Sequence, residues 1–330
     1  EAPAEAPALG ETDYPVRFGW APLRSIRAGD RKLIEAPRPE FYDLLQDPGE
    51  MQNRYEPWNQ KVQELRALLA TASARAATPP GTSGQVSEKT LEHLRALGYL
   101  GSDPGQSNVP EPSLLPDPKD KIELQNLVHR AMMADEDGRQ DVARRELLKA
   151  VAADGSLAVA FVQLGQIELS QGSFAEASTH LAQARRLRPQ DSAAAWYHGQ
   201  ALHKLGNLAA ARDALEQSLR LTPGQYDARL LLGKIYVSLQ DAPSAEDQFE
   251  AAAFLKPQRV EARRELARLY LDGKRFSEAA AQLEKAVAAG AESAELFELL
   301  GRAYSGLGRA EAARRAAGRA AALRQKEKAP

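Results

Sequence analysis

Histidines are the side chains of this chain best suited to bind a metal or to transfer a proton near neutral pH. Only His198 and His203 are close in sequence, and residues five apart on a helix do not share one face, while His93, His129 and His180 are isolated. The 330 residues include no cysteine, which excludes thiolate zinc ligands, disulfides and a cysteine nucleophile. No glycine spacing matches a phosphate-binding loop. The sequence therefore predicts no metal site, no cofactor and no catalysis.

The charge of the chain argues against two classes of partner. There are 43 Lys and Arg residues against 45 Asp and Glu residues, and a net charge of −2 predicts no general attraction to nucleic acid or to an acidic membrane. No apolar run approaches the ~20 residues of a membrane span, and residues 1–7 lack the basic and apolar regions of an export signal. We expect neither nucleic-acid binding nor membrane insertion. The acidic Pro-Ala start without methionine looks like an interior piece of a longer polypeptide.

Small residues recur at one constant interval through the second half of the chain. Gly or Ala is expected at such a spacing where two antiparallel helices cross closely, and Pro189, Pro223 and Pro257 would end the second helix of a pair. Self-similarity at this period predicts a mainly α-helical protein, a superhelical solenoid of stacked helical hairpins. The recurring pairs are Gly165 with Ala177, Gly199 with Ala211, Gly233 with Ala245, Ala267 with Ala279, and Gly301 with Ala313.

This pattern resembles the tetratricopeptide repeat, which has Gly at its eighth place, Tyr at its eleventh, Ala at its twentieth and Pro at its thirty-second. Six repeats then begin near residues 124, 158, 192, 226, 260 and 294, within a solenoid over 119–327. The aromatic residue expected at the fourth place is replaced by Arg229 and Arg263 in two copies. Glycines at the turn inside each hairpin are expected to take a positive φ, although the turn at 240–243 lacks one. These turn glycines are Gly172, Gly206, Gly273 and Gly308.

Residues 1–76 predict a small α+β segment. We expect a helix from about Pro57 into Ala74, because Val62, Leu65 and Leu69 recur on one helical face. A unit of this size is marginal alone and is expected to dock on a larger body. The predicted short strands are Val16–Trp20, Leu23–Arg27, Lys32–Ala36 and Glu40–Leu44, with a hairpin turn at Ala28–Arg31.

A second family resemblance covers roughly residues 1–100. Several strings in this part, with the helix Leu91–Leu97 that ends in Gly98-Tyr99, are similar to the C-terminal subdomain of sulfatases and to the tail of bacterial sulfatases that carry tetratricopeptide repeats. The strings are Tyr14-Pro15, Phe18-Gly19-Trp20, Arg24-Ser25-Ile26-Arg27, Lys32-Leu33-Ile34, residues 36–44, and Asp47-Pro48-Gly49-Glu50.

The sulfatase resemblance carries over no catalytic residue. That family uses a formylglycine made from the Cys or Ser of a Cys/Ser-x-Pro-x-Arg motif, beside a divalent cation held by Asp, Asn or His. The nearest string here, Ser102-Asp103-Pro104-Gly105-Gln106, ends in Gln where the motif needs Arg. No Asp-His-Gly or Asp-Asn-Gly string occurs. We therefore do not expect this chain to hydrolyse sulfate esters.

A linker is predicted between the two parts of the chain. Residues 77–118 are rich in Pro, Gly and Ser, which favours an extended and mobile segment. A short helix over 87–98, with Ser87 as its N-cap, is expected inside it. The predicted domains are therefore 1–76, 77–118 and 119–327.

The concave wall of the predicted solenoid is the candidate binding surface, because the first helices of stacked hairpins line it. At the ninth place of successive repeats, Lys234, Arg268 and Arg302 form a basic ladder, opposed by nearby glutamates. Trp196 either anchors a partner or packs inward in place of a missing aromatic residue, and both readings stay open. The candidate groove residues are Gln166, Trp196, Tyr197, Gln200, Lys204, Lys234, Arg264, Arg268 and Arg302, opposed by Asp227, Glu261, Glu265, Asp272, Glu295 and Glu298.

Two functions are compatible with these observations. We expect a non-catalytic scaffold that binds a protein or an extended peptide in the groove, with an acidic peptide as the best match to the ladder. The alternative is the C-terminal portion of a sulfatase-family hydrolase whose catalytic domain lies upstream, with the repeats positioning the enzyme. Relatives of that kind are typically exported, which would place the chain outside the cytoplasm.

Overall fold

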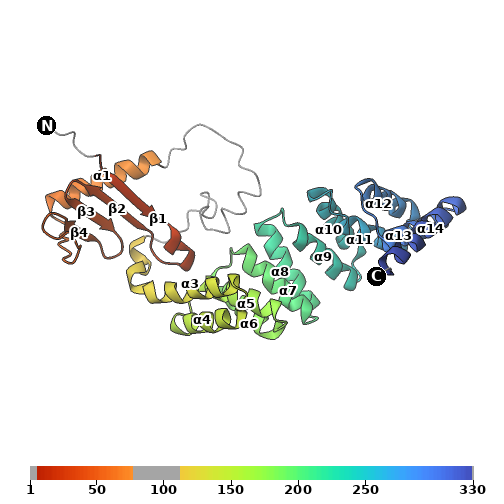
Figure 1. Ribbon diagram of the computed structural model, residues 1–330, viewed down its shortest axis with the longest axis horizontal. Helices are drawn as coiled ribbons and strands as arrows, with labels where there is room; N and C mark the ends of the chain where they lie inside the picture. Colours follow the sequence, from red (N-terminus) through yellow and green to blue (C-terminus); the bar gives the residue numbers. More distant parts are fainter. Residues whose placement is uncertain (1–5, 77–111, 329–330) are drawn as a thin grey trace. The chain divides into compact units, whose positions relative to one another are not determined.

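The computed structural model describes residues 6–76 and 112–328. The chain divides into two compact units, Glu1–Ala160 and Phe161–Pro330. The helix expected over 87–98 lies outside the described residues. Among the described residues the fold is mainly helical, with a small antiparallel sheet near the N-terminus (Figure 1). The domain limits at 76 and 118 stay a prediction.

The sheet has four antiparallel strands in the order β1-β2-β3-β4. A row of apolar residues crosses it, because Leu9 pairs with Ile26, Ile26 with Leu33, and Leu33 with Phe41. Helix α1 (Gln60–Ala76) covers Ile26, Leu33 and Phe41 of this row and leaves Leu9 exposed (Figure 1). Its own residues in this core are Val62, Leu65 and Leu69. The strands are β1 (Ala8–Thr12), β2 (Leu23–Ala28), β3 (Arg31–Glu35) and β4 (Glu40–Asp43).

One predicted strand is wrong. Residues Tyr14–Phe18 form a 3₁₀ helix, because Pro15 starts it and Gly19 ends it in a left-handed conformation with φ of 80°. Trp20 follows, buried and stacked on Phe18 with ring centroids 4.6 Å apart. The first strand of the sheet is β1, which the sequence pattern did not indicate.

Within the N-terminal unit, the sheet segment is bonded to the residues that precede the first repeat. Asp117 is buried, and its carboxylate accepts hydrogen bonds from the backbone N–H groups of Arg38 (3.1 Å) and Lys119 (2.9 Å). The Lys119 ammonium bonds Glu40 at 2.8 Å, and the backbone N–H of Ala21 donates to the carbonyl of Pro116 at 3.0 Å. The small α+β segment is therefore docked, as the area argument expects.

Twelve α-helices follow within residues 112–328. The first helices of five hairpins begin at Ala158, Ser192, Tyr226, Glu261 and Ala294, within one residue of the predicted register. The helices are α3 (Ile122–Glu136), α4 (Gln140–Ala153), α5 (Ala158–Ser170), α6 (Phe174–Leu187), α7 (Ser192–Lys204), α8 (Leu208–Leu221), α9 (Tyr226–Ser238), α10 (Ala242–Leu255), α11 (Glu261–Asp272), α12 (Phe276–Ala288), α13 (Ala294–Gly306) and α14 (Ala310–Lys328).

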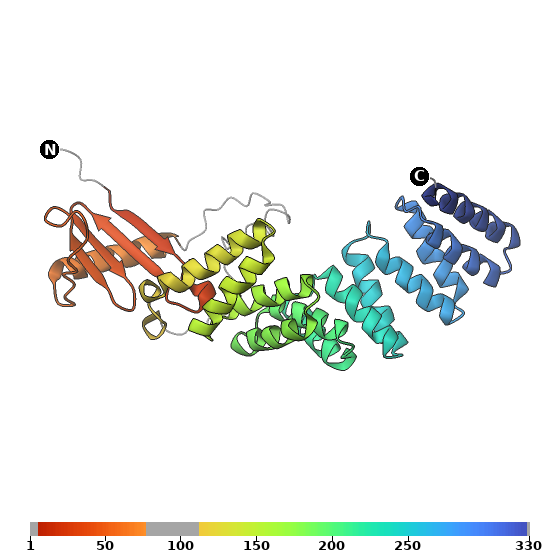
Figure 2. The same ribbon diagram turned by 60° about the horizontal axis from the view of Figure 1, so that its bottom comes forward.

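In the C-terminal unit the hairpins stack in chain order (Figure 2). The small residues lie at the helix crossings, as their regular spacing predicts. Leu215 of α8 packs so closely on Gly199 of α7 that an added methyl group would lie 2.7 Å from it. Leu181 and Phe249 cover Gly165 and Gly233 in the same way. The alanines that the spacing pairs with these crossings are fully buried on the second helices at Ala177, Ala211, Ala245 and Ala279.

The turn inside each hairpin holds its positive φ at one fixed place of the repeat. Gly172, Gly206 and Gly308 occupy that place, with φ between 71° and 78°. Gln240 and Lys274 occupy it in two other hairpins, with φ of 61° and 57°. Gly273 is therefore not the left-handed residue of its turn, because its φ is −79°. Two non-glycine residues adopt a conformation that favours glycine.

Candidate partner-binding face of the repeats

The candidate groove residues all lie on first helices of hairpins. Gln166 is on α5, and Lys234 is on α9. Ion pairs join some of the candidates, whereas the side chains on α5 and α7 are outside that network. The remaining candidates are Trp196, Tyr197, Gln200 and Lys204 on α7, Arg264 and Arg268 on α11, and Arg302 on α13.

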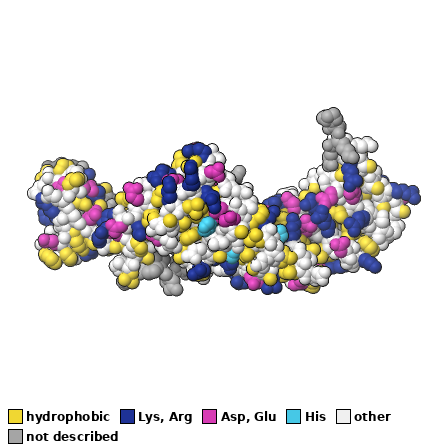
Figure 3. Space-filling model, turned by 90° about the horizontal axis from the view of Figure 1, so that it is seen from below, with side chains coloured by type: hydrophobic (Ala, Val, Ile, Leu, Met, Phe, Trp, Pro, Cys, Tyr) yellow, Lys and Arg dark blue, Asp and Glu magenta, His cyan; other side chains and the backbone are white. Residues whose placement is uncertain are grey.

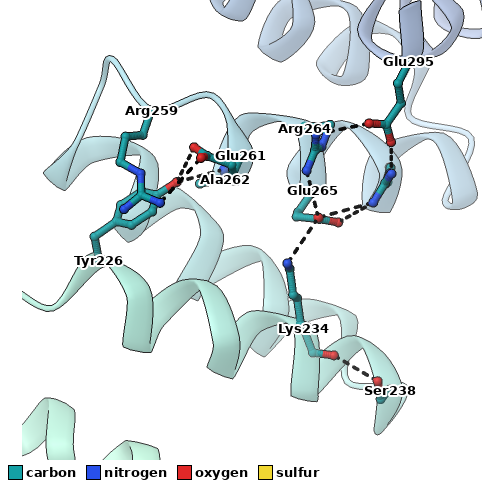
Figure 4. A network of polar contacts seen from close by, with 10 residues as sticks. Tyr226, Lys234, Ser238, Arg259, Glu261, Ala262, Arg264, Glu265 and Glu295 are labelled. Atoms are coloured by element: carbon teal, nitrogen blue, oxygen red, sulfur yellow. Dashed lines mark hydrogen bonds and ion pairs between the residues drawn. The ribbon is translucent and has the colours of Figure 1, made fainter. Parts of the chain in front are cut away.

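Lys234, Arg264 and Arg268 converge on two carboxylates (Figure 4). Glu265 accepts contacts from Lys234 at 3.7 Å, Arg264 at 4.0 Å and Arg268 at 3.1 Å. Glu295, from the next hairpin, pairs with Arg264 at 3.1 Å and also with Arg268. Part of the predicted basic ladder is thus neutralised inside the protein. Three cations face two carboxylates, so the cluster keeps a single positive charge.

Two candidate cations stand outside this cluster. Lys204 and Arg302 are exposed, and neither forms an ion pair within residues 6–76 and 112–328. Lys204 and Lys234 lie near His203, whose pKa is lowered first by burial and then by these two charges. Figure 3 shows Lys and Arg side chains interleaved with Asp and Glu over the C-terminal repeats.

Trp196 and Tyr197 are both half-buried. Trp196 packs against a buried cluster from α7, α8 and α9 that includes Leu202, Leu215 and Leu232. Tyr197 packs against the buried cluster that contains Leu181 of α6. Each ring therefore has an apolar contact on one side while part of the side chain reaches the surface.

A second group of charged side chains, around Tyr226, was not among the candidate groove residues. The Arg259 guanidinium lies 4.1 Å from the centroid of the Tyr226 ring (Figure 4). It also pairs with Asp227 at 2.9 Å. The Tyr226 hydroxyl donates to Glu261 at 3.2 Å. Burial, with Glu261 as the second cause, raises the pKa of Tyr226 to about 12.

The arginines at the fourth place of two repeats have a structural partner. Arg229 donates to the side-chain oxygen of Gln248 at 3.1 Å, and Arg263 donates to that of Gln282 at 3.2 Å. Both bonds run from the first helix to the second helix of one hairpin. The sequence could have indicated them, because an Arg and a Gln replace the usual residues at the same two places of successive repeats.

Arg185 of α6 is a half-buried cation whose direct partners are neutral. It donates to Nδ1 of His198 on α7 at 2.8 Å and bonds the side-chain oxygen of Gln217 on α8. Burial, followed by the charge of Arg185, lowers the pKa of His198 to about 4. Nε2 of His198 lies 3.2 Å from the Ser178 hydroxyl. His198 is therefore a neutral acceptor at physiological pH.

A cavity of about 860 Å³ opens at the last hairpin, lined by α13 and α14 and also by Leu271 of α11 and Phe276 of α12. Its lining is mostly apolar, with Phe297 and Gly301 on α13 and Ala313, Ala317 and Ala320 on α14. Charged side chains at its edge are Glu298, Arg302 and Arg324, and Arg324 pairs with Glu298 at 2.6 Å.

Neither a metal-binding cluster nor a membrane-spanning helix occurs among the described residues. No group of three or more His, Cys, Asp or Glu residues could hold a metal ion in that part of the chain. None of its described helices is both long enough and apolar enough to cross a membrane.

Stacked antiparallel hairpins with close crossings at a fixed period define an α-solenoid, a class of repeat protein. The tetratricopeptide repeat family model matches residues 162–226, 204–260, 230–294 and 264–330, which together span just over half of the chain. The chain belongs to the tetratricopeptide repeat family. No catalytic family is among the matches, and the sulfatase resemblance of residues 1–100 has no counterpart there. No curated protein matches the chain in sequence.

Solved structures with the same fold include a tetratricopeptide repeat protein from Parabacteroides merdae ATCC 43184, with a TM-score of 0.52 and 18% identity over 61% of this chain and 80% of that one. MamA has a TM-score of 0.50 and 18% identity, over 52% of this chain and 94% of that one. YrrB, described as a repeat protein with an unusual peptide-binding site, has a TM-score of 0.49 and 20% identity, over 54% of this chain and 91% of that one. At these identities the likeness concerns the fold alone.

Proposed function

We propose that the chain is a non-catalytic scaffold that binds an acidic, extended segment of a partner protein along its first helices. The observation that carries this proposal is that several cations on that face are not paired one-to-one with carboxylates among the described residues. Lys204 and Arg302 have no ion pair among the described residues, and the cluster between them keeps one uncompensated positive charge. These charges lie on the first helices of successive hairpins, which suits a partner that follows the stack.

Trp196 and Tyr197 support the same proposal. Tyr and Trp are the residue types that most often dominate protein interfaces, and both side chains are held by apolar contacts while remaining partly exposed. A side chain held in this way loses little conformational freedom when a partner covers it. Gln166 and Gln200, at the ninth place of their repeats, would offer amide groups to a partner backbone.

An array of unstructured peptides, graded in net negative charge, tests the proposal with the full chain. Affinity should rise with negative charge and fall as salt is added, because exposed charges are screened over ~8 Å at physiological ionic strength. The double variant Lys204→Glu, Arg302→Glu changes two unpaired cations and leaves the Glu265 and Glu295 network intact. We expect it to bind the most acidic peptides about tenfold more weakly.

The matched control is the double variant Arg145→Glu, Arg186→Glu. These two arginines are exposed on second helices, and the control makes the same change in net charge. It should keep most of the affinity of the wild type. Equal weakening by both double variants would show that net charge alone determines binding, and it would overturn the proposed face.

The sulfatase alternative is the second candidate function, and one feature of the N-terminal unit favours it. Leu45, Met51 and Trp58 of the sulfatase-like segment are 75%, 83% and 78% exposed. Large apolar side chains with such exposure are typical of interfaces, here one with a catalytic domain. The test is to read the coding sequence upstream of Glu1. An in-frame Cys/Ser-x-Pro-x-Arg motif would support this alternative, and its absence would refute it.

A further inference from the structure

The last hairpin lacks a side chain that earlier hairpins have. Leu181, Leu215 and Phe249 cover the glycine of the preceding helix so tightly that an added methyl group would collide with them. The equivalent residue of the last hairpin, one full repeat after Leu283, is Ala317. At Gly301 the nearest atom to an added methyl group is the carbonyl oxygen of Ala313, at 3.7 Å. The space filled in the earlier hairpins is therefore left open.

This open space is part of the cavity of about 860 Å³ at the last hairpin. Pockets of roughly 300–1,000 Å³ hold small ligands, so the cavity is large enough for a phenylalanine side chain and its neighbours. Ala317 is exposed, so the cavity is accessible from solvent. Its alanine lining and Phe297 offer apolar contact but no buried polar partner among the described residues. An apolar side chain is therefore the matching occupant.

The charges around the cavity select the kind of partner. Arg302 lies at its edge without an ion pair among the described residues. The described side chains of α14 carry far more positive than negative charge, so a second copy of this helix would meet like charge, whereas an acidic segment would meet opposite charge. The charged residues in question are Arg314, Arg315, Arg319, Arg324 and Lys326, against Glu311.

We propose that the cavity at the last hairpin binds one large apolar side chain of the acidic partner segment. This inference rests on the proposed function, because Arg302 belongs both to the first-helix face and to the edge of the cavity. It adds the requirement for a leucine or phenylalanine among the acidic residues. The anchor lies at the C-terminal end of the face, where no large second-helix side chain covers Gly301 within the described residues.

Two synthetic peptides test the proposal by fluorescence anisotropy with the full chain. One has a single phenylalanine between two runs of glutamate, and the other has alanine in its place. The wild type should bind the phenylalanine peptide about tenfold more tightly or better, which is the effect of burying one such side chain. Ala317→Leu, which copies Leu215 and covers the part of the cavity over Gly301, should remove this preference. Ala322→Leu, on the same helix outside the cavity lining, should keep it.

The outcomes separate this inference from the proposed function. Equal binding of the two peptides by the wild type would overturn the anchor cavity, and so would a preference that survives in Ala317→Leu. In either case, weaker binding of both peptides by Lys204→Glu, Arg302→Glu would leave the basic face supported. Absence of any charge-dependent binding would overturn both. Because Ala317→Leu fills part of the cavity, its melting temperature should be equal to or above that of the wild type, which excludes unfolding as the cause of a lost preference.

Discussion

The Tyr236 hydroxyl donates a hydrogen bond of 2.6 Å to the Glu216 carboxylate, between neighbouring hairpins. The same spacing in sequence joins Tyr270 to Glu250 at 3.2 Å and Tyr304 to Glu284 at 2.9 Å. A tyrosine of each of these first helices is thus bonded to a glutamate of the preceding second helix. Burial, followed by the bond to Glu216, raises the pKa of Tyr236 to about 12. The recurring geometry of these bonds ties successive hairpins together.

Replacing Tyr270 by Phe should destabilise the protein by about 1–2 kcal/mol. Tyr270 is buried, and its hydroxyl proton is shared between Glu246 at 2.9 Å and Glu250 at 3.2 Å, so the change removes the donor for two carboxylates and keeps the ring. Tyr304→Phe is the matched control, with a smaller loss, because its bond to Glu284 is exposed. Urea unfolding followed by circular dichroism measures both. Equal losses would show that burial does not set the strength of this link.

Adding one methyl group should have opposite effects at two glycines of the same repeat place. Gly233→Ala would press on the Phe249 ring and should cost about 1–3 kcal/mol. Gly301→Ala adds a methyl group that makes only ordinary van der Waals contacts, the nearest at 3.7 Å, and it removes a helix-interior glycine, so it should gain up to about 1 kcal/mol. Thermal melting measures both changes: the melting temperature should fall for Gly233→Ala and rise for Gly301→Ala. A loss of stability in Gly301→Ala would contradict the open crossing in the last hairpin.

Lys274→Gly should raise the unfolding free energy by about 1 kcal/mol. Lys274 has a φ of 57°, a conformation that is costly for a residue with a Cβ atom. Gly206→Ala makes the reverse change at the equivalent turn, where φ is 76°, and should lose stability. The comparison uses denaturant midpoints at equal slope. If both variants shift the midpoint in one direction, the turn conformation is not the cause.

His198 should make the protein less stable in mild acid. Its pKa in the folded protein is about 4, below the value of 6.5 for a free histidine, so the unfolded chain takes up this proton first. Neutral His198 contributes fully to the free energy of unfolding above pH 6.5, and this contribution is lost progressively as pH falls from 6.5 to about 4. The total loss is on the order of 2–3 kcal/mol. Arg185 and Ser178 are the groups that face the ring.

The measurement for His198 is the difference in stability between the wild type and His198→Gln across this pH range. The glutamine side chain keeps an acceptor for Arg185 but does not titrate, so carboxylates that titrate in both proteins cancel. As pH falls, the wild type should lose stability relative to His198→Gln, because only the wild type loses the contribution of neutral His198. A difference that stays flat between about pH 7 and pH 4 would rule out His198 as the group responsible.

Much of the fold was predictable because it depends on close contacts that only small residues allow. The spacing of Gly165, Gly199 and Gly233 predicted the helix crossings, and the first helices begin within one residue of the predicted register. Strand β1 was not predictable, because its residues are all exposed and it pairs with β2 through backbone bonds. The 3₁₀ helix over Tyr14–Phe18 was missed although Pro15 and Gly19 mark its ends.

The candidate face was less predictable than the fold. Lys234, Arg268 and Arg302 were identified as a row because they occupy the same place in successive repeats. The directions of their long side chains, however, depend on packing between hairpins. Glu265 and Glu295 were both expected as opposing charges, but the sequence does not show that Glu295 of the next hairpin pairs with both Arg264 and Arg268. The cavity at Ala317 could have been found from sequence, since alanine replaces a large residue at one place of a regular repeat.

The tyrosine bonds have a consequence for how such a chain can change length. Each bond joins partners on two neighbouring units, at the same separation in sequence every time. Removing residues 226–259, one whole unit, would bring Tyr270 into the position of Tyr236 opposite Glu216. The new junction would therefore be bonded like the old one. Genetic gain or loss of whole units preserves this contact, whereas deletion of a single residue between partners would shift the hydroxyl away from its carboxylate.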